Sequence, residues 1–81
     1  MRLDKYLKVS RIIKRRSVAN DACDTGHVSV NGKEAKPGTE VKVGDVIAIR
    51  FGERFTRYEV LSVSEHAAKA QAADMYRALS D

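Results

Sequence analysis

The sequence predicts a small α+β domain with two N-terminal helices, an antiparallel sheet of about four short strands, and a C-terminal helix. Three observations lead to this prediction. Apolar residues recur at helical spacing near the N-terminus, at a period of two from His27, and at helical spacing again after Ser64. The 81 residues suffice for one domain and not for two, so we expect a single domain over 1–81.

The first 26 residues are predicted to form a helical hairpin. Leu3 and Leu7 lie four residues apart, which places them on one face of a helix over residues 2–9. Ser17 is a suitable N-cap for a second helix, and Gly26 is a typical residue just past its end. The two helices are therefore expected to be short and joined by a basic turn.

The middle of the chain has the pattern of antiparallel strands. Val28 and Val30 alternate with polar residues, and Asn31-Gly32 is a strong signal for a two-residue hairpin turn. Val41 and Val43 also alternate, which predicts a further strand. Two more strands are predicted over residues 46–51 and 55–63.

A C-terminal helix is predicted over about residues 65–80, because a one-sided apolar stripe recurs there. Its members are Ala68, Ala72, Met75, Tyr76 and Leu79. The aromatic residues fit the core positions of these elements, and no pair of them has the strand spacing used for base stacking. They are Tyr6, Phe51, Phe55, Tyr58 and Tyr76.

Positive charge is concentrated at the N-terminal end. Residues 1–16 hold seven cations against Asp4 alone, whereas residues 17–81 hold eight cations against ten acids. The stretch "SRIIKRRS" (10–17) has four cations and no acid, and charges of one sign at this density repel each other unless an anion binds. Arg15 and Arg16 also precede a helix N-terminus, whose free N–H groups favour phosphate. The sequence thus indicates a nucleic-acid backbone as partner.

Several function classes are not supported by the sequence. The chain lacks metal-ligand spacing, phosphate-binding glycine loops and nucleophile motifs, so we expect no enzyme activity, no metal and no cofactor. Cys23 is the sole cysteine and fits a buried small position, which agrees with a reducing compartment. We find no apolar run long enough to span a membrane and no signal peptide, and we expect a cytoplasmic protein with no membrane partner.

A combination of motifs resembles a known family. The residues "RLDKYL", "SR", "SVANDACDTGHVSVNG" and "GDVIAIRF" resemble the alpha-L RNA-binding domain, the type named after small-subunit ribosomal protein four. The resemblance covers about residues 2–60, with Cys23 where a larger apolar residue is usual. It implies that the two helices and the following hairpin form an L-shaped surface on folded RNA.

The start "MRLDKYLKVSRIIKRR", the "RFG" after the core strand and "AADMYRAL" are similar to stand-alone members of bacterial ribosome-associated quality control. That resemblance implies binding to the split large ribosomal subunit, through its rRNA and the P-site peptidyl-tRNA. It also implies that RqcH acts on the same particle and delivers alanyl-tRNA, so that the stalled chain gains a C-terminal alanine tail without mRNA. We expect a monomer away from the ribosome.

The resemblance also implies the RNA-binding residues. Arg2 and Arg16 match arginines of the motif that are expected to touch RNA. The supporting cations are Lys5, Arg11, Lys14, Arg15 and Lys33. Each of these supporting cations could instead be a solvated surface charge without an RNA contact. His27 could contact RNA or could cap the strand.

Other functions remain open at this point. One is a heat-shock-type ribosome recycling factor on the same particle, although the basic C-terminal extension of those proteins is missing from this sequence. Another is a protein–protein adaptor that uses the hairpin and the last helix. A third is a detached appendage of a larger enzyme.

Overall fold

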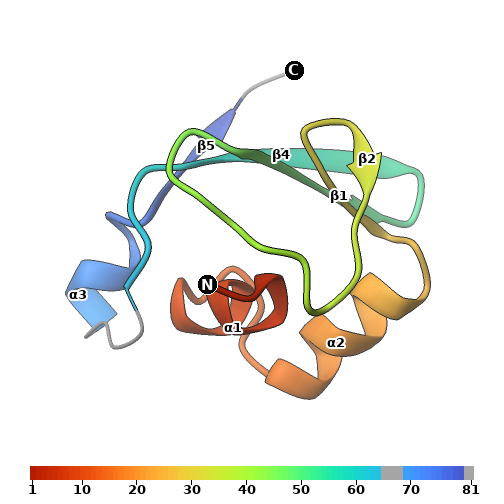
Figure 1. Cartoon of the computed structure of the whole chain (residues 1–81), viewed down its shortest axis with the longest axis horizontal. Helices are drawn as coiled ribbons and strands as arrows, with labels where there is room; N and C mark the ends of the chain where they lie inside the picture. The colour runs from red at the N-terminus through yellow and green to blue at the C-terminus, as the bar shows by residue number, and fades with distance from the viewer. Residues whose placement is uncertain (65–68, 80–81) are drawn as a thin grey trace.

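A computed structural model gives the architecture, and it describes residues 1–64 and 69–79. Two helices are followed by four strands, a short helix and a fifth strand (Figure 1). The elements are α1 (Leu3–Val9), α2 (Arg16–Asp24), β1 (Val28–Val30), β2 (Lys33–Glu34), β3 (Val46–Phe51), β4 (Arg54–Val60), α3 (Lys69–Ala72) and β5 (Tyr76–Leu79).

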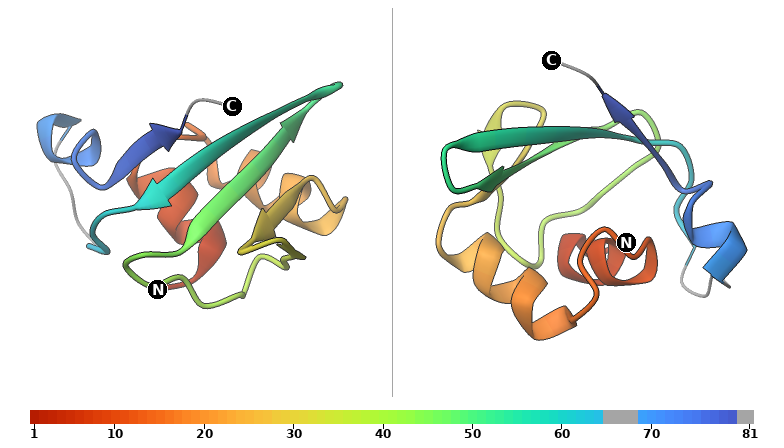
Figure 2. Two further views of the ribbon diagram at one scale, coloured as in Figure 1. Left: turned by 90° about the horizontal axis from the view of Figure 1, so that it is seen from above. Right: turned by 180° about the vertical axis from the view of Figure 1, so that it is seen from behind.

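The strands form one antiparallel sheet in the order β2-β1-β3-β4-β5. Helices α1 and α2 lie side by side against one face of this sheet (Figures 1 and 2). In the part of the chain that the structure describes, no helix lies on the opposite face. The fold therefore has a helical face and an outer sheet face, and the predicted α+β class is confirmed.

The core fills the space between the helices and the sheet. Leu3, Tyr6 and Leu7 of α1 are fully buried, and they lie in one cluster with Ile47 and Ile49 of β3. Each such side chain contributes about 1.5–3 kcal/mol of burial free energy. The Tyr6 hydroxyl donates a hydrogen bond of 2.7 Å to the Met75 carbonyl oxygen, which ties α1 to the C-terminal segment.

The predicted hairpin turn is confirmed. Asn31 and Gly32 both have positive φ, 53° and 83°, as a type I′ turn requires. The Asn31 side chain also accepts a hydrogen bond from the Val46 N–H (3.0 Å) and donates one to Asp45 (3.1 Å). The turn is thereby fixed against the start of β3.

The strand predicted around Val41 and Val43 is wrong. Val41 is buried, but Val43 is 62% exposed, and the segment runs as a loop. Only Glu40 makes a bridge, with Arg2. The reason is that both edges of β3 are already occupied, by β1 and β4, so the hydrophobic Val41 packs without a strand partner.

The C-terminal helix is much shorter than predicted. Helix α3 ends at Ala72, where turn hydrogen bonds from Asp74 and Met75 follow, and residues 76–79 form β5 instead. Tyr76 and Leu79 fit a strand because β4 offers a free edge, and Arg77 pairs with Glu59 across it at 2.6 Å. The rest of the predicted helix, residues 65–68 and 80, lies outside the described residues.

One aromatic prediction is also wrong. Tyr6 is buried, and Tyr58 and Tyr76 are half-buried with an edge-to-face ring contact at 5.3 Å. Phe55, however, is 58% exposed on β4. Strand β4 alternates between the two faces of the sheet, and Phe55 falls on the outer one.

Candidate nucleic-acid interface

Asp4 is the centre of the basic helical face. Its side chain is only 2% exposed, yet it pairs with two arginines from different elements. Arg2 Nε lies 3.3 Å from Asp4 Oδ1 and Arg2 Nη2 lies 3.3 Å from Oδ2, while Arg16 Nη2 lies 3.5 Å from Oδ2. The Lys5 N–H donates to Oδ1 at 2.8 Å. A buried carboxylate needs such partners, because an unpaired buried charge is costly.

The local sequence explains why these groups meet. Arg2 is the N-cap of α1, Asp4 lies in the first turn, and Arg16 is the first residue of α2. The packing of α1 against α2 brings the two helix starts to one carboxylate. The Arg2 and Arg16 side chains nevertheless remain 56% and 53% exposed, so their guanidinium groups stay accessible to a ligand.

The turn between the helices presents further cations. Ile13 is buried and anchors the turn, whereas Arg11, Lys14 and Arg15 are exposed. Arg11 has φ of 64°, a left-handed conformation that follows the end of α1 and is usually taken by glycine. The chain therefore holds an arginine at a position where its backbone is strained.

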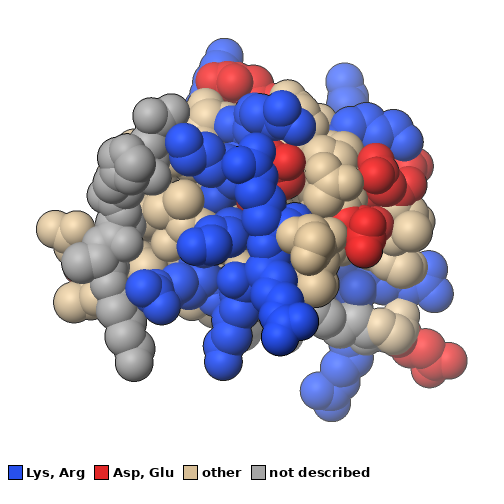
Figure 3. Space-filling view, turned by 90° about the horizontal axis from the view of Figure 1, so that it is seen from below, with Lys and Arg blue, Asp and Glu red and all other residues tan. Residues whose placement is uncertain are grey.

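The remaining predicted residues divide between two places. Lys5 lies on α1, three residues after Arg2, and is partly buried. Figure 3 shows Lys and Arg side chains as an almost continuous band on the side that carries α1 and α2. Lys33 lies on β2, in the sheet and not on the helices. The structure thus groups Arg2, Arg16 and the turn cations and sets Lys33 apart.

The start of α2 differs from the predicted cap. The helix begins at Arg16, with Arg15 as N-cap and no side-chain hydrogen bond there, so Ser17 lies inside the helix. The first turn of α2 also contains no acid. Its free N–H groups and partial positive charge are therefore not neutralised by an acid of that turn, which suits a phosphate ligand.

Sequence reasoning missed the role of Asp4, which it counted only as the single acid of residues 1–16. The sequence does place Arg2 two positions before Asp4, which indicates a local ion pair. The second partner, Arg16, comes from α2 and could not be predicted from local spacing. Lys8, exposed on α1, also belongs to the charged face and was not among the predicted binding residues.

The comparisons with known proteins agree with this geometry. A family model described as S4 domain matches residues 1–47, which hold α1, α2 and the first hairpin. The RQC P-site tRNA stabilizing factor of Listeria innocua is 52% identical over 81 residues, 100% of this chain and 88% of that protein. The protein of the same name from Bacillus subtilis is 44% identical over 100% of this chain and 94% of its own length.

The chain belongs to the S4-domain family of RQC P-site tRNA stabilizing factors. A solved structure of trimeric heat shock protein 15 from Vibrio cholerae superposes with a TM-score of 0.87 at 32% identity, covering 98% of this chain and 81% of that one. The fold is thus shared with heat shock protein 15. The S4 match contains all seven of the predicted RNA-binding residues, from Arg2 to Lys33.

The titratable core groups of this S4 protein are not set up as nucleophiles. Burial, with the nearby charges of Asp4 and Asp24, raises the pKa of the Cys23 thiol to about 11. Burial, and then Tyr76, raises the pKa of Tyr6 well above its usual value. Both groups are therefore protonated at neutral pH, and the predicted buried position of Cys23 is confirmed.

Within residues 1–64 and 69–79, no cluster of three or more His, Cys, Asp and Glu side chains could hold a metal ion. Over the same residues, no helix has the length and apolar character needed to cross a membrane.

Proposed function

We propose that this protein binds the split large ribosomal subunit that carries a peptidyl-tRNA and stabilises the P-site tRNA there. The observation that carries the proposal is the Arg2–Asp4–Arg16 arrangement, in which a buried carboxylate holds two half-exposed guanidinium groups on a basic face. Guanidinium groups bind phosphate oxygens bidentately, and fixed ones lose little freedom on binding. The names of the relatives support tRNA as part of the target.

The protein's role is that of a positioning factor. Arg2 and Arg16 bind RNA phosphates, with Lys5, Arg11, Lys14, Arg15 and Lys33 in support, and they hold the tRNA against nearby rRNA. RqcH acts on the same particle, where it delivers alanyl-tRNA for C-terminal alanine tailing without mRNA. The ribosome performs the peptide transfer, and this chain supplies no catalytic group. We place this activity in the cytoplasm, with the protein monomeric when not bound.

The test is co-sedimentation of the tagged protein on sucrose gradients at low and high salt, with sequencing of the bound RNA. We expect migration with large subunits that carry tRNA. Binding should weaken as salt rises, with a log–log slope near −0.7 to −0.9 for each phosphate contacted, which an apolar protein–protein adaptor would not show.

The Arg16→Ala variant makes this test specific. We expect it to weaken binding to the particle by about 1–3 kcal/mol, as for a lost charge-assisted contact, without unfolding the protein. Lys42→Ala is the matched control, because Lys42 is exposed in the loop before β3 and its loss also removes one positive charge. If Arg16→Ala lowers the melting temperature but leaves binding intact, or if both variants bind equally weakly, the assignment of Arg16 is wrong.

A second candidate is a heat-shock-type recycling factor, which the 0.87 TM-score to heat shock protein 15 favours. The two candidates differ in their dependence on RqcH. Deleting this protein should abolish alanine tails on stalled chains under the first proposal. Under the second, the tails should persist while free large subunits with peptidyl-tRNA accumulate.

A further inference from the structure

The outer face of the β3–β4 hairpin carries an exposed aromatic side chain among arginines. Phe55 is 58% exposed, and its directly paired partner across the sheet is Arg50. Arg57 lies two residues further along β4 and pairs with Leu79 of β5. Directly paired residues in antiparallel strands point to the same face, so Arg50, Phe55, Arg57 and Leu79 form one group, here called the hairpin platform.

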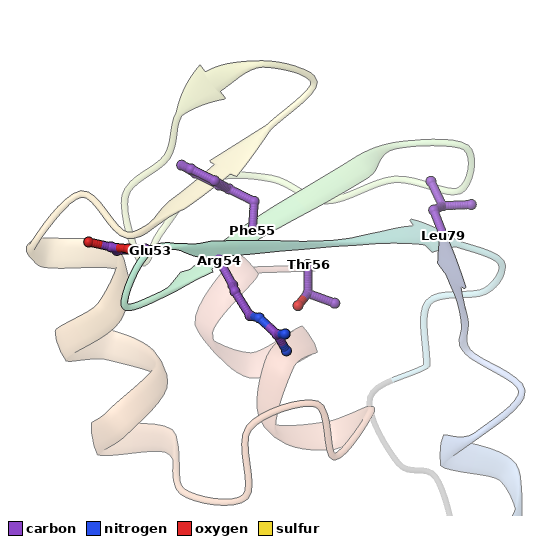
Figure 4. Close-up of a pocket in the computed structure, with 5 residues that line it drawn as sticks. All are labelled: Glu53, Arg54, Phe55, Thr56 and Leu79. Carbon is purple, nitrogen blue, oxygen red and sulfur yellow. The ribbon is translucent and has the colours of Figure 1, made fainter. Parts of the chain in front are cut away.

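Phe55 and Leu79 of the platform line a hollow of about 480 Å³, together with Glu53, Arg54 and Thr56. Figure 4 shows Phe55 and Leu79 pointing away from the helices, while Arg54 and Thr56 point to the helix side. The neighbours at the centre of the sheet are small, since Arg57 pairs with Ala48 and Ala48 with Ser29. A flat group can therefore approach the Phe55 ring from the outer side.

The charged residues around Phe55 are mostly arginines, although the acid Glu53 also lines the hollow. Arg50 is held at the hairpin end by a 2.7 Å hydrogen bond from its Nε to the Gly52 carbonyl oxygen. On the same face, the acid Glu59 is already paired with Arg77 at 2.6 Å. Phe55 and Leu79 together offer far less apolar area than the ~800 Å² per partner of a stable protein interface. An aromatic ring between arginines suits a nucleic-acid base with its flanking phosphates.

We propose that the hairpin platform binds an unpaired RNA base, with Phe55 stacking on the base and Arg50 and Arg57 contacting the adjacent phosphates. This inference rests on the proposed function and extends it. The platform lies on the sheet face opposite to the Asp4 arrangement, and the molecule measures 30 × 27 × 20 Å. One small protein would thereby hold two RNA segments, one on each face.

Single tryptophan reporters test this directly, because the chain contains no tryptophan. Phe55→Trp reports on the platform, and Val18→Trp, 50% exposed on α2 near Arg16, reports on the helical face. Val43→Trp is the control, because Val43 is 62% exposed and precedes β3, at the end of that strand far from the hairpin turn. The probes are an RNA stem-loop with a single-stranded adenine tail and the same stem-loop without the tail.

We expect the tailed RNA to quench Phe55→Trp emission at least about 2-fold more than the blunt stem-loop, since only an unpaired base stacks there. Val18→Trp should respond to both RNAs and Val43→Trp to neither. Phe55→Ala should bind the tailed RNA about 5-fold or more weakly, and Phe55→Tyr should retain binding. Phe55 is exposed, so these variants should keep the melting temperature of the native chain.

The other outcomes separate the two proposals. A response of Val18→Trp with a silent Phe55→Trp overturns the platform and leaves the proposed function intact. Silence of all three reporters overturns both. A blue shift of Phe55→Trp emission with protein concentration, without RNA, means that a second copy covers Phe55, and it also overturns the RNA contact.

Discussion

At the scale of single residues, the decisive feature is a buried acid inside a basic surface. The negative charge of Asp4 lowers the net positive charge of the face that we propose to bind RNA. Any contribution of Asp4 to RNA binding must therefore come from holding the Arg2 and Arg16 side chains in place. Holding two long side chains in advance saves about 0.5–1.5 kcal/mol each on binding. The lost long-range attraction is smaller, because salt screens it within about 8 Å.

We therefore expect Asp4→Asn to weaken RNA binding about 3- to 10-fold, although it raises the net charge. It should also lower the free energy of unfolding by about 1–3 kcal/mol, less than for a fully buried pair because both arginines are half exposed.

Asp21→Asn is the matched control, because Asp21 is an exposed acid on α2 and its replacement removes the same charge. Binding isotherms on the Arg16→Ala background complete a double-mutant cycle. The positioning role of Asp4 would be contradicted if Asp4→Asn and Asp21→Asn changed RNA binding equally. It would also be contradicted if the effects of Asp4→Asn and Arg16→Ala on binding were additive.

At the scale of elements, the end of α1 combines backbone strain with charge. Arg11 has φ of 64°, a conformation that costs a non-glycine residue about 1–2 kcal/mol. Arg11→Gly should raise the free energy of unfolding by about 1 kcal/mol, whereas Arg11→Ala should not, because alanine keeps the strain. Both variants should weaken RNA binding equally, since both lose the guanidinium. Thermal melts and binding isotherms check this pair, and a stable Arg11→Gly with undiminished binding would exclude Arg11 from the interface.

The elements also show what could be predicted from sequence. Helices α1 and α2 and the Asn31-Gly32 hairpin follow from local spacing and turn chemistry, and all three are confirmed. Strand β5 could not be found this way, because its residues fit a helical stripe and the strand is selected by the free edge of β4. The exposure of Phe55 likewise depends on which face of β4 the helices cover. Of the candidate site, the arginines were predicted from charge and motif, but the link through the buried Asp4 depends on the contact between two helices.

At the scale of the whole molecule, the buried Cys23 thiol and Tyr6 hydroxyl make the free energy of unfolding depend on pH in the alkaline range. Cys23 of α2 and Tyr6 of α1 are both fully buried, and the Tyr6 hydroxyl donates a hydrogen bond to the Met75 carbonyl oxygen. Ionising either group would therefore place a charge in the core between the helices and the sheet and destabilise the folded state. The pKa of Cys23 is raised from 9.0 to about 11, and that of Tyr6 is raised from 10.0. Below the unfolded pKa both states hold the proton and full stability is present. Above it, the unfolded state loses its proton first, so the free energy of unfolding falls as pH rises.

For Cys23 this loss should begin near pH 9.0 and be complete near pH 11, and its size should be on the order of 2–3 kcal/mol. Urea denaturation from about pH 7 to about pH 11 measures it. Cys23→Ala, which is less stable at neutral pH because it leaves a small cavity, should lose less stability over the same range. Tyr6→Phe should remove the part of the alkaline loss that begins near pH 10.0, the ordinary pKa of tyrosine. Parallel curves for the native chain and both variants would mean that surface charge repulsion, and not the core, governs alkaline unfolding.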